Sequence, residues 1–154
     1  LLLIKKQLIM KKLIVSFCLA FLAFSAQAQY FEKLDKDENV TKVVVSKGLF
    51  SLIGKVSDKK NLTTEDKKVM DFIDRIKSFK MYTSTGNSQR NEMKAIAGKY
   101  RKSKEFEELM RINDGGKEVE FLVKSGKKDE ISELIMFVEG SGDNESVIFQ
   151  LSLS

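Results

Sequence analysis

Two serine–lysine pairs have the spacing of a nucleophile and its activating base. Ser57 with Lys60, and Ser125 with Lys128, match Ser-x-x-Lys, a pattern in which a lysine can activate a serine nucleophile. Both pairs lie in polar, lysine-rich segments, and the companion motifs of penicillin-recognising enzymes do not occur. Because the chain holds 27 basic residues, chance matches are expected. We assign neither serine a catalytic role.

Two further segments imitate binding sites. DKDEN, residues 35–39, resembles the start of a calcium loop, but that loop needs a glycine at its sixth position and a glutamate at its twelfth, where this chain has Val40 and Ser46. KYRKSK, residues 99–104, could hold phosphate or an acidic polymer. The alternative, which we favour, is a basic helix end with Tyr100 facing the core. The sequence therefore predicts no metal-binding residue and no nucleic-acid partner.

Carboxylates are the remaining candidates, because glycosidases work with two of them at a defined separation. The acids in question are Glu105, Glu107, Glu108, Glu118 and Glu120. In alternating strands such glutamates are expected on the face in contact with water. A carboxylate-dependent hydrolase of envelope polymers stays open as the alternative function. It requires a pocket with two inward-facing acids whose pKa values are raised.

Residues 10–29, MKKLIVSFCLAFLAFSAQAQ, have the three parts of a secretory signal peptide: two lysines, a largely apolar run and an Ala-x-Ala end. The run is too short for a spanning helix, which needs roughly 20 apolar residues. We expect cleavage after Ala28, so that residues 10–28 are removed. The product is then periplasmic or secreted, with no transmembrane anchor. Residues 1–9 precede the expected initiator and are attributed to an over-extended reading frame.

Cys18 lies inside this leader, after Phe17 and before further apolar residues. A lipid-attachment cysteine follows the apolar core and a small residue, so a lipoprotein is not expected. Residues 1–28 contain four lysines and no acid. Without them, the 27 basic residues become 23 against 22 acidic ones, and the net charge falls from +5 to +1. The basic pI of the whole chain is then no argument for nucleic-acid binding.

The expected mature chain has neither cysteine nor histidine. It therefore lacks disulfides, thiolate nucleophiles and thiolate zinc sites. It equally lacks histidine-based triads and imidazole metal ligands. Any catalysis would have to use carboxylates, lysine, tyrosine or hydroxyl groups. We predict no catalytic residue and no cofactor.

The elements that would position these residues can be located by periodicity. Residues 29–154, 126 in all, have the size of one domain. Residues 31–40 are predicted to be a short helix or turn, 40–46 a buried strand and 78–84 an extended segment. Thr63 with Asp66 is an N-cap signature. Helical stripes are Leu49, Leu52, Ile53 and Val56; Val69, Met70, Ile73 and Ile76; and Met93, Ile96, Ala97 and Tyr100.

From Phe106 onward the period changes to two. NDGG, residues 113–116, is a hairpin signal, because Asp-Gly tolerates positive φ. Val119, Phe121 and Val123 alternate with charged residues, so one face of that strand is expected to be wet. ISELIMFV, residues 131–138, is apolar on both faces and predicts a central strand, and 147–153 alternates again. The predicted fold is α+β: a two-layer sandwich of a largely antiparallel sheet with helices on one face and a C-terminal β-meander.

Three segments together resemble a known family. They are VTKVVVSKGLFSLI (40–53), IKSFKMYTST (76–85) and FEELMRINDGGKEVEFLVKSGKKDEISELIMFV (106–138). The chain is similar over its mature length to the domain-of-unknown-function 4252 family, small exported proteins of Bacteroidota, some of them lipoproteins. The resemblance implies a cell-envelope protein. It implies no catalytic residue, substrate or cofactor.

We predict a non-catalytic binding, accessory or sensory module with an envelope protein as its partner. Sheet edges, which accept an added strand, and the surface around Tyr82 and residues 84–90 are the expected binding places. A scaffold protein without any ligand is a third alternative. The sequence does not give the oligomeric state.

Overall fold

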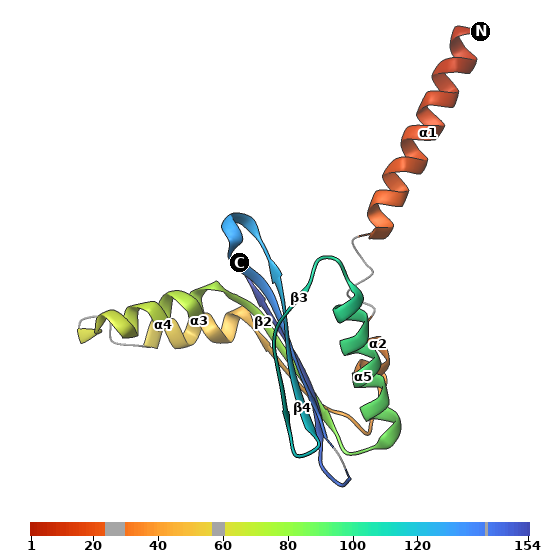
Figure 1. Ribbon diagram of the computed structural model, residues 1–154. Helices are drawn as coiled ribbons and strands as arrows, with labels where there is room; N and C mark the ends of the chain where they lie inside the picture. Colours follow the sequence, from red (N-terminus) through yellow and green to blue (C-terminus); the bar gives the residue numbers. More distant parts are fainter. Residues whose placement is uncertain (24–29, 57–60, 141) are drawn as a thin grey trace. The chain divides into compact units, whose positions relative to one another are not determined.

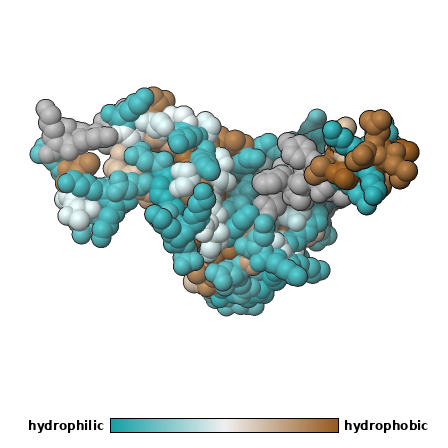
Figure 2. Space-filling view, turned by 90° about the horizontal axis from the view of Figure 1, so that it is seen from above, coloured by the Kyte–Doolittle hydropathy of each residue, from teal (hydrophilic) through white to brown (hydrophobic). Residues whose placement is uncertain are grey.

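The computed structural model describes residues 1–23, 30–56, 61–140 and 142–154, and contacts divide the chain into two compact units, Leu1–Lys33 and Leu34–Ser154. The first unit contains helix α1 (Leu2–Ala23), whose exposed apolar side chains are brown in Figure 2. No helix in the described part of the chain is long and apolar enough to cross a membrane. The expected cleavage point after Ala28 and the side chain of Cys18 lie outside the described residues.

The second unit is built on a six-stranded antiparallel sheet with the strand order β1-β2-β6-β5-β4-β3 (Figure 1). The strands are β1 (Thr41–Ser46), β2 (Ile76–Ser84), β3 (Glu107–Asp114), β4 (Lys117–Ser125), β5 (Ile131–Glu139) and β6 (Ser146–Leu153). Strands β3 to β6 form a meander in chain order, and β2 and β1 extend the sheet beyond β6. The predicted α+β fold with a C-terminal meander is confirmed.

The helices are arranged unequally about this sheet. They are α2 (Glu32–Lys36), α3 (Lys47–Val56), α4 (Thr64–Arg75), α5 (Asn87–Lys102) and the short 3-10 helix η2 (Lys127–Asp129). Helix α5 lies along one face of the sheet, whereas α3 and α4 form a hairpin that projects on the other side (Figure 1). The predicted short helix or turn at 31–40 is confirmed by α2.

Helix α5 and the sheet form the core. All four residues of its predicted stripe, Met93, Ile96, Ala97 and Tyr100, are buried. They face an apolar cluster on the sheet that consists of Tyr82, Leu122, Ile135, Phe137 and Ile148. The ring of Tyr100 meets Phe106 edge to face, with 4.9 Å between centroids. This burial stabilises the layer by roughly 1.5–3 kcal/mol for each large apolar side chain.

Two local signals read from the sequence are confirmed. The NDGG turn joins β3 to β4, and Gly115 and Gly116 have φ values of 56° and 86°, a region that favours glycine. Helix α4 starts with a capping box, in which Asp66 N donates to Thr63 Oγ1 at 3.2 Å and Thr63 N donates to Asp66 Oδ2 at 2.9 Å.

Two predictions about elements are wrong. The strand at 40–46 is not buried: β1 pairs only with β2, so it is an edge strand, and Val44 is 52% exposed. Ile76 does not continue the stripe of α4. That helix ends at Arg75, and Ile76 has extended backbone and begins β2, where its side chain is buried.

Candidate functional site

The pairing registers place every second residue of the sheet on the same face. One row across the six strands is Lys42, Tyr82, Ile148, Phe137, Glu120 and Arg111. This row belongs to the face on which α5 lies, called here the helix-covered face. The residues next to these along the chain point to the opposite side. On that side, called here the open face, the α3–α4 hairpin projects away from the sheet, and no described helix of the second unit runs along the strands (Figure 1).

Three rows make up the open face. The middle row is Val43, Met81, Phe149, Met136, Phe121 and Met110. On the hairpin side of it are Val45, Phe79, Leu151, Leu134, Val123 and Glu107. On its other side are Thr41, Thr83, Val147, Val138, Val119 and Ile112. Apart from two threonines and one glutamate, every position in these rows is apolar.

These apolar side chains are not covered. Most are half-buried by their neighbours in the sheet, and Met110 and Ile112 on the edge strand are each 45% exposed. Val123 is the buried exception. Phe79 and Phe149 contact each other on this face, with 5.4 Å between ring centroids. The open face is therefore a continuous apolar surface that extends across all six strands.

The α3–α4 hairpin overhangs one end of the open face, because it starts where β1 ends and finishes where β2 begins. Its predicted helical stripes are present, but much of them is exposed, and α4 contains no buried residue. The exposed apolar side chains are Leu49, Leu52, Ile53, Val69 and Phe72. Apolar surface is visible on the hairpin in Figure 2, between its charged side chains. The hairpin thus adds a second apolar surface on the open side.

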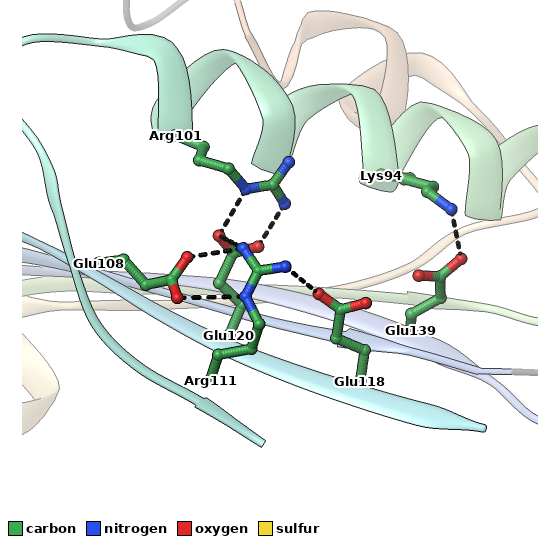
Figure 3. A network of polar contacts seen from close by, with 7 residues as sticks. All are labelled: Lys94, Arg101, Glu108, Arg111, Glu118, Glu120 and Glu139. Carbon is green, nitrogen blue, oxygen red and sulfur yellow. Dashed lines mark hydrogen bonds and ion pairs between the residues drawn. The ribbon is translucent and has the colours of Figure 1, made fainter. Parts of the chain in front are cut away.

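The helix-covered face contains the main ionic network (Figure 3), and here the sequence prediction is wrong. Glu120 was expected on a wet face, but it is 1% exposed beneath the C-terminal end of α5. Arg101 donates to both of its oxygens, from Nε to Oε1 at 2.7 Å and from Nη2 to Oε2 at 2.5 Å. Arg111 Nη2 reaches Oε1 at 3.3 Å. The guanidinium groups make burial of this carboxylate tolerable.

Arg111 also joins two further acids to this network. It donates to Glu108 at 3.1 Å and 2.6 Å and to Glu118 at 2.7 Å. Hydrogen bonding to Arg111 lowers the pKa of Glu108, and hydrogen bonding to Glu120 raises the pKa of Arg101. Glu108, Glu118 and Glu120 are therefore each paired with at least one arginine. The network joins α5 to the β3–β4 hairpin, and this arrangement is structural.

The surface predicted around Tyr82 is not present, because that side chain is fully buried and its hydroxyl donates to Asp35 Oδ1 at 2.8 Å. Residues 84–90 lead into α5 and border a cavity of about 360 Å³, lined by Asn87, Arg90, Asn91, Glu139, Gly140, Gly142 and Ser146. Arg90 Nη1 donates to Gly142 O at 2.7 Å across this cavity. Among the described residues that line the cavity, Glu139 is the one acid, and it pairs with Lys94 at 2.8 Å.

The hydrolase hypothesis requires a pair of inward-facing acids in a cavity. A cavity of about 190 Å³ beside α4 is bordered by Asp71 and Asp74, and both side chains are exposed. Glu133 is different, because burial raises the pKa of its carboxyl, although a hydrogen bond from Gln150 opposes this. Glu133 does not line either cavity. No described observation favours the hydrolase.

The other motifs are not assembled into sites. Asp35 binds Tyr82 and Lys42, whereas Asp37 accepts from Asn39 N at 2.9 Å and from Gln89 at 2.9 Å. Among the described residues, no three acids, histidines or cysteines gather to hold a metal. Ser57 and Lys60 lie outside the described residues, and Ser125 and Lys128 are exposed at the end of β4 and in η2. The predicted basic helix end is confirmed: Tyr100 is buried and Arg101 binds Glu120.

Comparison with known proteins identifies a family over most of the chain. A protein family described as "Domain of unknown function (DUF4252)" matches residues 30–152, which is most of the chain. Neither the curated proteins nor the solved structures give a significant match.

Proposed function

The chain belongs to the DUF4252 family, and from that premise we propose that it is a non-catalytic binding module of the cell envelope that works through its open face. The observation that carries this proposal is the set of three apolar rows on the side of the sheet away from α5. A surface of this kind binds another apolar surface and offers no acid–base group for chemistry.

The size of the open face supports the proposal. Strands lie about 4.8 Å apart and rise about 3.4 Å per residue, and the three rows occupy about six residues of each strand, so they present a face of roughly 600 Å². The largest apolar patch on an ordinary monomer measures roughly 300–600 Å² and is often functional. A face at the top of this range, beside the exposed apolar side chains of the α3–α4 hairpin, is expected to be covered when the protein works.

Export to the envelope is part of the same proposal. Its support is the leader pattern of residues 10–28, with two lysines, an apolar run and Ala-x-Ala. The chemistry left to the expected mature chain, with neither cysteine nor histidine, agrees with a binding role.

The test is site-specific photo-crosslinking in cells that express the full chain. A photoreactive residue at Ile112, which is exposed on the open face, is compared with one at Ala95, which is exposed on α5. The proposal predicts discrete covalent adducts of reproducible mass from position 112 and none from position 95. Adducts that are the same from both positions, or absent from both, contradict it.

A further inference from the structure

The occupant of the open face can be inferred from its size and chemistry. A stable protein–protein interface buries roughly 800 Å² on each partner. The three rows of the open face supply roughly three quarters of this area by the strand spacing and rise given above, and the exposed apolar residues of the α3–α4 hairpin add to it. One surface of matching size and apolar character is always available at the same concentration as the chain, namely the open face of a second copy.

Self-association is compatible with the charges on this face. In a two-fold symmetric pair both copies use the same patch, so residue i of one copy contacts residue j of the other, and like charges meet only near the two-fold axis. The middle row contains no charged residue. The one charged residue of the three rows, Glu107, lies on the edge strand β3, at the end of the row that also contains Val123. Two such faces can therefore approach without repulsion at their centre, and sheets that pack face to face lie about 10 Å apart with interdigitated side chains.

The α3–α4 hairpin gives a second reason to expect self-association through the open face. It projects on the side of the open face (Figure 1), and its exposed apolar residues include Leu52 and Val69, each 57% exposed. In a face-to-face pair, each hairpin would lie beside the sheet of the other copy and enlarge the contact. The same pairing would thus account for the exposed stripes of both α3 and α4.

The edge of the sheet formed by β3 is protected against pairing with a strand of another molecule. Strand β3 contains a register shift between Glu108 and Met110, and Arg111 with its three glutamates covers its helix-side surface. Bulges and charges of this kind discourage edge-to-edge association. Association through a face is therefore favoured over association through β3.

We propose that two copies of this chain associate through their open faces, giving a symmetric dimer with the layer order helix, sheet, sheet, helix. This proposal rests on the proposed function and names its partner. The central contact is the row from Val43 to Met110, with Met136 and Phe149 at its middle.

The experiment measures molar mass by light scattering after size exclusion, on protein purified from cells that express the full chain. Met136→Lys places a lysine in the middle row of the open face, and Met110→Lys places one at an exposed position of the same row. Ala95→Lys is the matched control on the exposed side of α5. Circular dichroism verifies that each variant is folded.

The expected result is a dimer for the wild type and for Ala95→Lys. Both open-face variants should have a dissociation constant raised at least about 100-fold, because each dimer would then place two charged lysines in an apolar contact. If Met136→Lys does not fold, Met110→Lys decides, since its site tolerates a polar side chain in the monomer.

Three results overturn the proposal. They are a monomeric wild type at its highest soluble concentration, dimers that survive the open-face substitutions, and a dimer that is lost in Val44→Lys on edge strand β1 but kept in Met136→Lys. A monomeric wild type that still gives adducts from position 112 with another envelope component refutes the dimer and leaves the proposed function standing. A monomer without such adducts refutes both.

Discussion

Glu120 and Phe121 are neighbours in β4 and lie on opposite faces of the sheet, with the charged side chain buried and the aromatic one left on the open face. Glu120 is buried because α5 covers it and Arg101 and Arg111 neutralise it. Phe121 is half-buried between Met110 and Met136. The sheet thus turns its more apolar side outward, and this is the physical basis of the binding role that we propose.

Arg101→Ala should destabilise the protein strongly, because it leaves the buried carboxylate of Glu120 with only the longer contact to Arg111. Breaking a buried ion pair costs about 3–5 kcal/mol, and we expect about 2–3 kcal/mol here because Arg101 is partly exposed. Urea unfolding measures this loss. Lys94→Ala on the same helix removes the exposed pair with Glu139 and should cost under about 1 kcal/mol. Equal losses in the two variants would contradict the structural role of the network.

Glu133→Gln should stabilise the protein at neutral pH. Burial raises the pKa of Glu133 above its ordinary 4.5, so the folded protein binds this proton more tightly than the unfolded chain does. The charged carboxylate therefore lowers the free energy of unfolding by its full amount above the raised pKa. This loss disappears as the pH falls through the raised pKa towards 4.5. The amide that replaces the carboxylate keeps an oxygen for the hydrogen bond from Gln150.

The free energy of unfolding of wild type and Glu133→Gln is compared at several pH values. The advantage of the variant should be greatest at neutral pH and should vanish below about pH 4. An advantage that does not change with pH would mean that the ionisation of Glu133 is not its source. Wild-type measurements alone do not suffice, because Asp35 and Glu108 have lowered pKa values and act in the opposite direction.

Thr63→Ala should loosen α4 locally. Loss of the capping box costs a helix about 1 kcal/mol. Because α4 has no buried residue, its stability is only weakly coupled to that of the core. Amide hydrogen exchange in residues 64–75 should become about fivefold faster, with little change in the sheet. Thr64→Ala, at the next residue, is the matched control and should leave exchange unchanged.

The leader should be absent from native material. Intact-mass analysis of the protein, recovered from the envelope of the cells that naturally produce it, is expected to show a chain that starts at Gln29. Such a chain contains no cysteine and has a net charge of +1. A mass that includes Cys18, either unprocessed or acylated, would contradict export as a free mature chain.

Much of the fold could be predicted because its signals are local. The stripe of α5, the capping box at Thr63 and the Asp-Gly turn all depend on residues a few positions apart. Which elements meet depends on distant parts of the chain, and sequence periodicity does not contain that information. The edge position of β1 is one example, because a β-branched run looks the same at an edge as in the middle of a sheet.

The open face was missed for the same reason. Alternation in Val119, Phe121 and Val123 correctly showed that β4 has two different faces. The apolar face was expected to meet the helices, but α5 covers the other one. The expectation that Glu120 faces water is wrong because Arg101 pairs with it. Arg101 lies 19 residues before Glu120 and meets it only in the folded chain. A buried glutamate with an arginine partner has no signature in a single sequence.

Methionine oxidation is the decisive measurement of whether the open face is an interface between two copies. Met81, Met110 and Met136 lie in the middle row of the open face, while Met93 is fully buried under α5 and serves as an internal control. Mild peroxide converts accessible thioethers to sulfoxides, which mass spectrometry locates. If the open face is an interface with a second copy, oxidation of these three methionines slows together as the protein concentration rises, and Met93 stays slow throughout. Rates at Met81, Met110 and Met136 that do not depend on concentration would contradict the account.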